Sequence, residues 1–309
     1  MENKNTKKLG FGLKPSTYDP RDFSHAKVFG MPKREQLPEN DFFVSEPLEI
    51  KDQGRTDFCT AYAASAVSED QENVPLCPEY TFMAAKRILG KNAWKEWGLE
   101  LRDICRAACK YGFLEKDHYP FIGMEVDRDF LANPANWKEE SDILAEDHKK
   151  QSFFDAVDGP YDTFDNLRAT LFKNAAEKRS ILTGVNWRYA WNTAEKGIIP
   201  RTGWENEAGE GHAVKVFGQI KLDDPENPGK KALYLIVQNS WGDDSGDNGL
   251  FYFPREVVNK EFVFGAFTFS DMPREQAEYH SENGISVNDT TGTKIRKVIT
   301  NFLKALIGK

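Results

Sequence analysis

The hydrophobic pattern of this 309-residue chain changes once, from helical spacing in its first half to strand-like alternation from residue 211 onward. Such segregation favours a helical layer packed against a largely antiparallel sheet, because each element must bury one apolar face. We therefore expect an α+β fold of two lobes, an N-terminal helical lobe and a C-terminal antiparallel β-barrel-like lobe, with a cleft between them. The expected helices span residues 59–72, 78–90, 99–112 and 164–178, and the expected strands span residues 180–187, 212–220, 232–238, 249–253 and 261–269.

Four segments are expected along the chain. Residues 1–36, rich in Lys, Pro, Gly and Asp, predict an extension that lies across the domain as a strap, which we favour over a short pro-segment. Residues 37–275 form the folded domain, in which the charged stretch 122–165 predicts a surface excursion with a helix between residues 145 and 156. Residues 276–293 predict a linker, and residues 294–309 a basic amphipathic helix.

Cys59 follows a polar, glycine-containing loop and precedes small residues that favour a helix. At such a junction, free N–H groups and the positive end of the helix dipole favour thiolate over thiol. Far downstream, His212 supplies a base and Asn239 an amide that can orient it, while Gln53 adds an amide six residues before Cys59. Each residue alone is typical of a core or a turn. Together and in this order they predict a cysteine hydrolase.

These motifs resemble those of the papain-like cysteine peptidase family. That family has a Gln-Gly six residues before its nucleophilic Cys, a Gly-His-Ala-Val segment around its base and an Asn-Ser-Trp-Gly segment around its orienting Asn. Residues 53–54, 211–214 and 239–242 match these segments in the same order, and the resemblance extends over residues 37–270. It implies the papain-like two-lobe fold, with the active-site cleft between the lobes.

The resemblance also implies a role for each matched residue. Cys59 would attack the scissile carbonyl, His212 would carry the proton and Asn239 would fix the imidazole tautomer. The side-chain amide of Gln53 would form the oxyanion hole with the backbone N–H of Cys59. Three further positions expected to bind substrate or cover the site are Trp97, Gly98 and Trp241.

Two departures from the family pattern indicate which branch of the family the sequence resembles. Thr56 stands where relatives usually have a disulfide cysteine, and Thr60 stands where they have the Trp that follows the nucleophile. With the short N-terminal segment, these losses resemble a bacterial or viral branch that lacks the usual pro-domain and disulfides.

The composition argues against several classes of protein. A net charge of −8 disfavours nucleic acid as the main partner. No apolar run reaches transmembrane length and no secretory signal is evident, so we expect a cytoplasmic protein, with a phage virion or a host cytoplasm as alternatives.

No cofactor is expected. Cys105 and Cys109 share one helix face, which favours two buried thiols over half of a metal site.

Two classes of function remain open. The intact set of four residues favours a thiol peptidase acting on a protein or peptide. The missing Trp at position 60 and the tail leave room for an inactive or weakly active papain-like binding or structural module in a larger assembly, and acyl transfer to an amine is a weaker third candidate. The helix 294–309 would dock on a partner or in an oligomer, pack on its own domain or, less favoured, lie on an anionic membrane.

Overall fold

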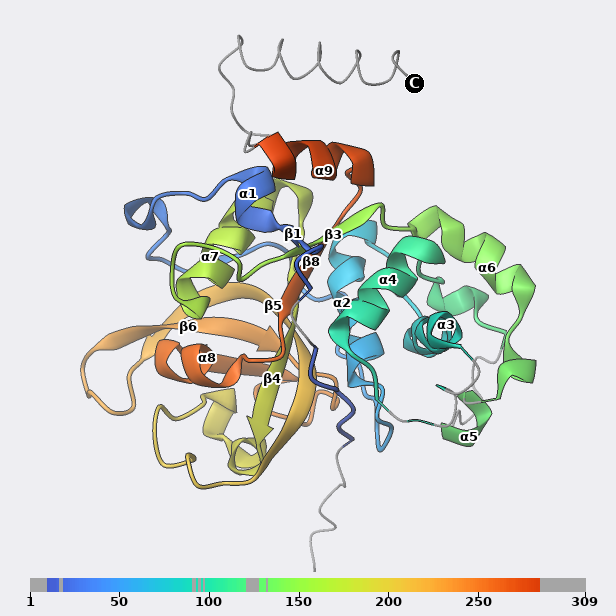
Figure 1. Cartoon of the computed structure of the whole chain (residues 1–309). Coiled ribbons are helices and arrows are strands. Elements are labelled where there is room, and N and C mark those ends of the chain that lie inside the picture. Colours follow the sequence, from blue (N-terminus) through green and yellow to red (C-terminus); the bar gives the residue numbers. More distant parts are fainter. Residues whose placement is uncertain are drawn as a thin grey trace, which may run out of the picture.

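The computed structural model describes residues 10–16, 19–90, 93, 96, 98–120, 128–131 and 133–283. It has the expected α+β arrangement of two lobes (Figure 1). Helices α2, α3 and α4 lie in one lobe, and most strands of a single sheet lie in the other, where α7 and α8 pack against them. The tail helix predicted for residues 294–309 lies outside the described residues.

The helical lobe contains most of the described helices, and its three longest match the predictions. The 78–90 helix begins with Pro78, whose fixed φ suits the first helical position, and it ends at Gly90, which has a φ of 86°. The bounds are α2 Cys59–Glu72, α3 Pro78–Leu89, α4 Leu101–Lys110, α5 Arg128–Leu131 and α6 Glu139–Ala145.

The other lobe is built on an open sheet with the strand order β1-β3-β8-β4-β5-β6-β7, in which β2 also pairs with β5. All pairs are antiparallel except β1 with β3. The lobe predicted to be barrel-like is therefore an open sheet, because its described strands do not close into a ring. The bounds are β1 Phe23–Ser24, β2 Phe42–Phe43, β3 Ser152–Asp155, β4 Ile181–Arg188, β5 Gly209–Asp223, β6 Lys231–Gln238, β7 Leu250–Pro254 and β8 Ala266–Ser270.

Three further helices lie beside this sheet. They are α7 Thr163–Asn174, α8 Arg255–Glu261 and α9 Arg274–Asn283. The helix predicted over residues 164–178 is thus confirmed, but it ends earlier, at Asn174. The linker prediction is wrong for residues 276–283, because they belong to helix α9. None of the described helices is long and apolar enough to cross a membrane.

The helix predicted between residues 145 and 156 is wrong. The chain leaves α6 at Ala145 and forms strand β3 over Ser152–Asp155, between β1 and β8. Phe154 is fully buried while Phe153 is half-buried, and Ser152 donates a hydrogen bond to the carbonyl oxygen of Met272 at 2.7 Å. Four residues are too few to show a period of two, and both partner strands are distant in sequence. The predicted strand 261–269 likewise begins later, at Ala266.

Part of the predicted strap is built into the fold. Strand β1 pairs with β3, and the short helix α1 (His25–Phe29) follows it. His25 is fully buried, with its Nε2 2.9 Å from Oδ1 of Asn174, and Asp22 pairs with Arg102 of α4. Residues 22–29 are therefore held by a strand pair, a buried histidine and an ion pair.

The buried His25 makes stability depend on pH. Burial lowers the pKa of His25 to about 3, with smaller effects from Arg179 and Lys173, although the bond to Asn174 opposes them. Unfolded histidine binds a proton below about pH 6.5, whereas folded His25 does not. Stability is therefore lost as the pH falls: this residue should lower the free energy of unfolding by about 1.4 kcal/mol per pH unit from about pH 6 to about pH 4. Urea titrations at several pH values give the dependence of the unfolding free energy on pH. Between about pH 4 and about pH 6 this dependence should be smaller by about 1.4 kcal/mol per pH unit in His25→Gln, and an unchanged dependence would contradict the prediction.

Candidate active site

Cys59 is the first residue of α2 and is fully buried. Burial raises the pKa of its thiol to about 11, although backbone N–H groups, among them those of Ala213 and Gly12, lower it. The helix N-terminus alone therefore does not produce a thiolate here. The backbone of Ala213 lies next to the sulfur, so the strand β5 residue that follows His212 is in contact with Cys59.

His212 is held from two directions. Its Nε2 lies 2.7 Å from Oδ1 of Asn239, and its ring stacks on Trp241 with centroids 4.4 Å apart and planes 24° apart. Its Nδ1 is buried and has no hydrogen-bond partner among the described residues. Burial lowers the pKa of His212 to about 4, against the bond to Asn239, so the ring is neutral at pH 7.

Gln53 joins the two lobes at the site. Its Oε1 accepts a hydrogen bond of 2.6 Å from Oγ of Ser240, the residue after Asn239. Its Nε2 donates to the carbonyl oxygen of Thr56 at 2.7 Å and to that of Gly10 at 3.1 Å. The side-chain amide is thus fixed in one orientation, with its donor side facing an oxygen atom of the N-terminal segment.

Residues 10–14, which we call the cleft segment, run between the two lobes (Figure 1). On one side, Leu13 pairs in parallel with Leu99, through bonds from Leu99 N to Gly12 O and from Lys14 N to Leu99 O, both 2.9 Å. On the other side, Leu13 N donates to Gly211 O at 3.3 Å, immediately before His212. The cleft segment therefore contacts both lobes through its backbone.

The side chains of the cleft segment close the site. Phe11 packs edge-on against His212 and Trp241, with centroids 5.5 and 5.4 Å away. Leu13 is 8% exposed and joins the core of the helical lobe, where Leu99 lies. These contacts remove water from the surroundings of His212, which accounts for its lowered pKa.

Glycines permit this close approach. A methyl group on Gly10 or Gly12 would overlap the carbonyl oxygens of Thr56 and Asp57. Gly98, with a φ of 73°, faces the carbonyl oxygen of Gly12 in the same way. Gly98 was predicted to let a substrate backbone approach, and here it faces the chain's own backbone. Trp97, the other predicted position at this edge, lies outside the described residues.

The structure thus brings Gln53, Cys59, His212, Asn239 and Trp241 to one place. The motifs did not identify the cleft segment as part of the site. A usable signal was the alternation of glycines with large apolar residues in Gly10-Phe11-Gly12-Leu13, which suits a backbone that must pass close to others while its side chains enter pockets.

Comparisons with known proteins agree with this geometry. A family model described as papain family cysteine protease matches residues 45–264. The chain belongs to the papain family of cysteine proteases. It is therefore a cysteine-type peptidase by family, and protein or peptide substrates are expected of it.

Individual relatives of this papain-family protease are distant. An uncharacterised peptidase C1-like protein of Acanthamoeba polyphaga mimivirus is 24% identical over 280 residues, which are 85% of this chain and 78% of that protein. Xylellain, a cysteine protease from Xylella fastidiosa, has a TM-score of 0.64 at 23% identity, over 87% of this chain and 99% of its own. Procathepsin B of Trypanosoma congolense has a TM-score of 0.54 at 16% identity, over 85% and 87%. At these identities the structural likeness shows the fold.

The remaining cysteines of the protease lie outside the site. All four cysteines are free thiols; Cys77 and Cys105 are buried and Cys109 is half-buried. Burial raises the pKa of the Cys105 thiol well above its usual value, which fits a neutral core residue. Among the described residues, no group of three or more His, Cys, Asp or Glu could hold a metal ion.

A buried ion pair fixes the helix that carries Cys59. Nζ of Lys215, on β5, lies 2.6 Å from Oδ1 of Asp70, on α2, and neither side chain is more than 1% exposed. Nearer the Gln53 loop, Lys51 pairs with Glu69 of the same helix at 2.6 Å. Cys59 and His212 therefore lie on two elements that are joined by a charge pair three residues after His212.

Removal of one member of this pair should be costly. Lys215→Met leaves the Asp70 carboxylate buried without its partner, so we expect the free energy of unfolding to fall by about 3–5 kcal/mol in urea titrations. Lys230→Met, in the exposed hairpin loop after β5, is the control and should change stability by less than about 0.5 kcal/mol. Lys215→Met/Asp70→Leu should recover much of the loss. Equal effects of the two single variants would contradict the prediction.

Proposed function

We propose that this papain-family protease hydrolyses peptide bonds through Cys59, His212 and Asn239. The observation that carries the proposal is the His212–Asn239 hydrogen bond of 2.7 Å, stacked under Trp241 and beside the helix N-terminus where Cys59 stands. Asn239 holds the Nε2 side of the ring, which leaves Nδ1 as the nitrogen to exchange a proton with Cys59. Asn239 orients the imidazole without adding a charge.

The reaction follows from these positions. The Cys59 thiolate attacks the substrate carbonyl, protonated His212 gives its proton to the leaving amine, and His212 then activates water to hydrolyse the thioester. Nε2 of Gln53 and the N–H of Cys59 stabilise the oxyanion. In the structure, Nε2 of Gln53 donates to the carbonyl oxygens of Thr56 and Gly10, so displacement of the cleft segment would free the donor that now binds Gly10 for a substrate oxygen.

The described conformation is that of a latent enzyme. The cleft segment occupies the space between the lobes, and burial favours neutral forms of both groups, with the pKa of Cys59 raised to about 11 and that of His212 lowered to about 4. Displacement of the cleft segment would admit water, lower the pKa of Cys59 and raise that of His212. A thiolate–imidazolium pair is then favoured near pH 7.

Release of the cleft segment should activate Cys59. Leu13→Asp places a charge where an apolar side chain is buried; since that burial is worth about 1.5–3 kcal/mol, we expect alkylation of Cys59 by iodoacetamide at pH 7 to accelerate at least about tenfold. Lys14→Gln is the matched control, because the Lys14 side chain points outward to Glu96. Intact mass after proteolytic mapping identifies the alkylated cysteine. Equal rates in both variants would show that the cleft segment does not protect Cys59.

Loss of one oxyanion donor should lower turnover. In the Leu13→Asp background, Gln53→Ala should reduce kcat for a fluorogenic peptide by about 10²–10³ with a smaller change in KM. Ser240→Ala is the control: it removes the hydrogen bond at Oε1 of Gln53 but keeps the Nε2 donor. A loss as large in Ser240→Ala would assign Gln53 a structural role.

The occupied cleft also favours a second candidate, a papain-like module that binds a partner without catalysis. The two candidates differ in the outcome for Leu13→Asp. Hydrolysis that disappears in Leu13→Asp/Cys59→Ala supports the peptidase, whereas a freely alkylated Cys59 without hydrolysis of any peptide in a broad library supports the binding module.

A further inference from the structure

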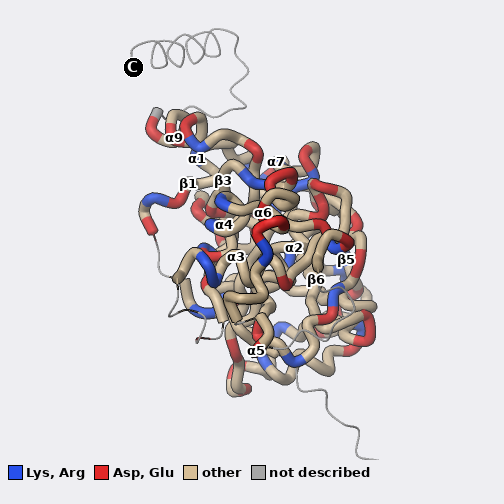
Figure 2. The backbone as a smooth tube through the Cα atoms, turned by 90° about the vertical axis from the view of Figure 1, so that its right-hand side faces the viewer, with Lys and Arg blue, Asp and Glu red and all other residues tan. Residues whose placement is uncertain are grey.

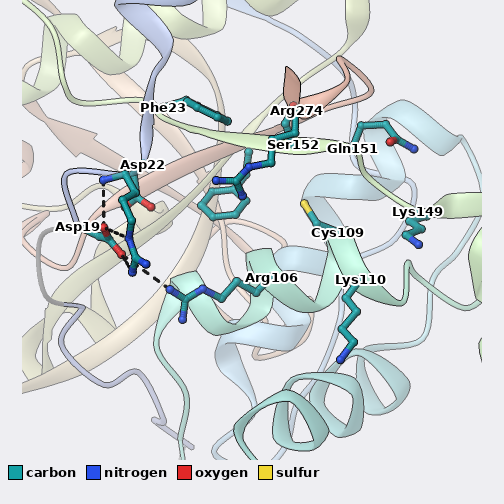
Figure 3. A pocket seen from close by; sticks show the side chains of 12 residues that line it. Asp19, Asp22, Phe23, Arg106, Cys109, Lys110, Lys149, Gln151, Ser152 and Arg274 are labelled. Atoms are coloured by element: carbon teal, nitrogen blue, oxygen red, sulfur yellow. Dashed lines mark hydrogen bonds and ion pairs between the residues drawn. The ribbon is translucent and has the colours of Figure 1, made fainter. Parts of the chain in front are cut away.

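A cavity of about 610 Å³ lies away from the cleft, between the N-terminal segment, α4, the start of β3 and the first residue of α9 (Figure 3). None of the residues that line it belongs to the cleft segment or to the site around Cys59. Its lining includes two aromatic rings, those of Phe23 and Phe153, and comes from four separate parts of the chain. The size is within the range of small-molecule sites.

Positive side chains dominate the lining. Five cations face it: Arg21, Arg106, Lys110, Lys149 and Arg274. Only two carboxylates accompany them, Asp19 and Asp22. Over the rest of the described backbone, basic and acidic residues are interspersed, with no lobe of one sign (Figure 2), and the whole chain has a net charge of −8. The cavity is thus a local concentration of positive charge on an acidic protein.

The two carboxylates do not neutralise this charge. Asp22 is paired with Arg102, which does not line the cavity, at 3.0 Å. Asp19 accepts hydrogen bonds from Arg21 and lies 3.8 Å from Arg106. One carboxylate is therefore left for five cations.

Three of these cations have no strong carboxylate partner within the cavity. Among the described carboxylates, Arg274 pairs only with exposed Glu278, one turn along α9, at 3.0 Å, and its guanidinium lies 5.4 Å from the centre of the Phe23 ring. Lys110 lies 5.1 Å from the centre of the Tyr111 ring, and neither Lys110 nor Lys149 forms an ion pair with a described carboxylate. Like charges gathered in this way repel one another, so an anion bound among them relieves a cost that the free protein bears.

We propose that this cavity binds a small organic phosphate that carries at least two phosphate groups. Phosphate places several negative charges in a small volume, and the guanidinium groups of Arg106 and Arg274 can donate paired hydrogen bonds to it, whereas Nε and Nη2 of Arg21 already donate to Asp19 and Arg21 contributes mainly its charge. The lysines add point charges, while Phe23 and Phe153 contact the organic part.

The site is connected to the N-terminal segment. Asp19 and Arg21 follow the cleft segment closely along the chain, and Asp19 is the carboxylate that a bound phosphate would displace from Arg106. Phosphate binding therefore competes with the contact between Arg106 and Asp19 of the N-terminal segment.

Isothermal titration of the full chain with inorganic triphosphate tests the proposal, at an ionic strength of about 0.15 M so that weak surface attraction is screened. We expect saturable binding of one triphosphate. Arg106→Gln/Lys110→Gln, both on α4, should weaken it by about tenfold or more, because two charge-assisted contacts are lost. The control is Lys230→Gln/Lys231→Gln, which removes the same charge from the last loop residue and the exposed first residue of β6, and it should change the affinity by less than about twofold.

The outcomes separate the alternatives. Absence of saturable binding, or equal weakening in both double variants, would overturn the proposal and leave only general charge attraction. Citrate that binds as tightly as triphosphate would contradict the assignment to phosphate. If the α4 variant is unfolded by circular dichroism, Lys149→Gln replaces it, with an expected loss of about threefold or more. Binding is measured without reference to peptidase activity, so this test stands apart from the proposed function.

Discussion

The buried ion pair between Lys215 and Asp70 is the contact on which the geometry of the site depends. It joins the helix that begins with Cys59 to the strand that carries His212, and burial would otherwise disfavour both charged groups, because it raises the pKa of Asp70 and lowers that of Lys215. Two apolar side chains could slide past each other with little loss, whereas two desolvated charges at 2.6 Å tolerate no such movement. The pair therefore fixes the position of helix α2 relative to strand β5, and with it the position of Cys59 relative to His212.

The cleft segment is held by a different kind of interaction. Its backbone forms strand-like bonds to Leu99 and Gly211, and its specificity comes from side chains that fill pockets on either side. Such contacts are individually weak and can be replaced by those of another extended chain. The molecule thus combines lobes that are joined by a buried ion pair with a segment between them that another extended chain could replace, which suits the latent enzyme that we propose.

Much of the fold and most of the site could be predicted from the sequence, because the evidence was local or came as motifs. Helix α2 follows a turn and contains small residues, and Cys59, His212 and Asn239 lie in short segments that resemble a known family. Strand β3 could not be found, since its four residues are defined by pairing with β1 and β8 rather than by their own pattern. The place of residues 10–14 and the basic cavity also escaped, because each depends on contacts between segments far apart in the chain.

The anchoring of residues 22–29 to β3, α4 and α7 decides how the cleft segment would compete with a substrate. The cleft segment ends only a few residues before this anchor, so it stays at a high effective concentration beside the cleft, which for short connections is in the millimolar range. Dilute peptides would compete poorly while the connection is intact. A single cut between residues 14 and 19 would end this advantage, since the freed peptide would diffuse away while the anchored residues stayed with the enzyme. Activation by such a cut would be irreversible, whereas displacement without cleavage would reverse as soon as the competitor left.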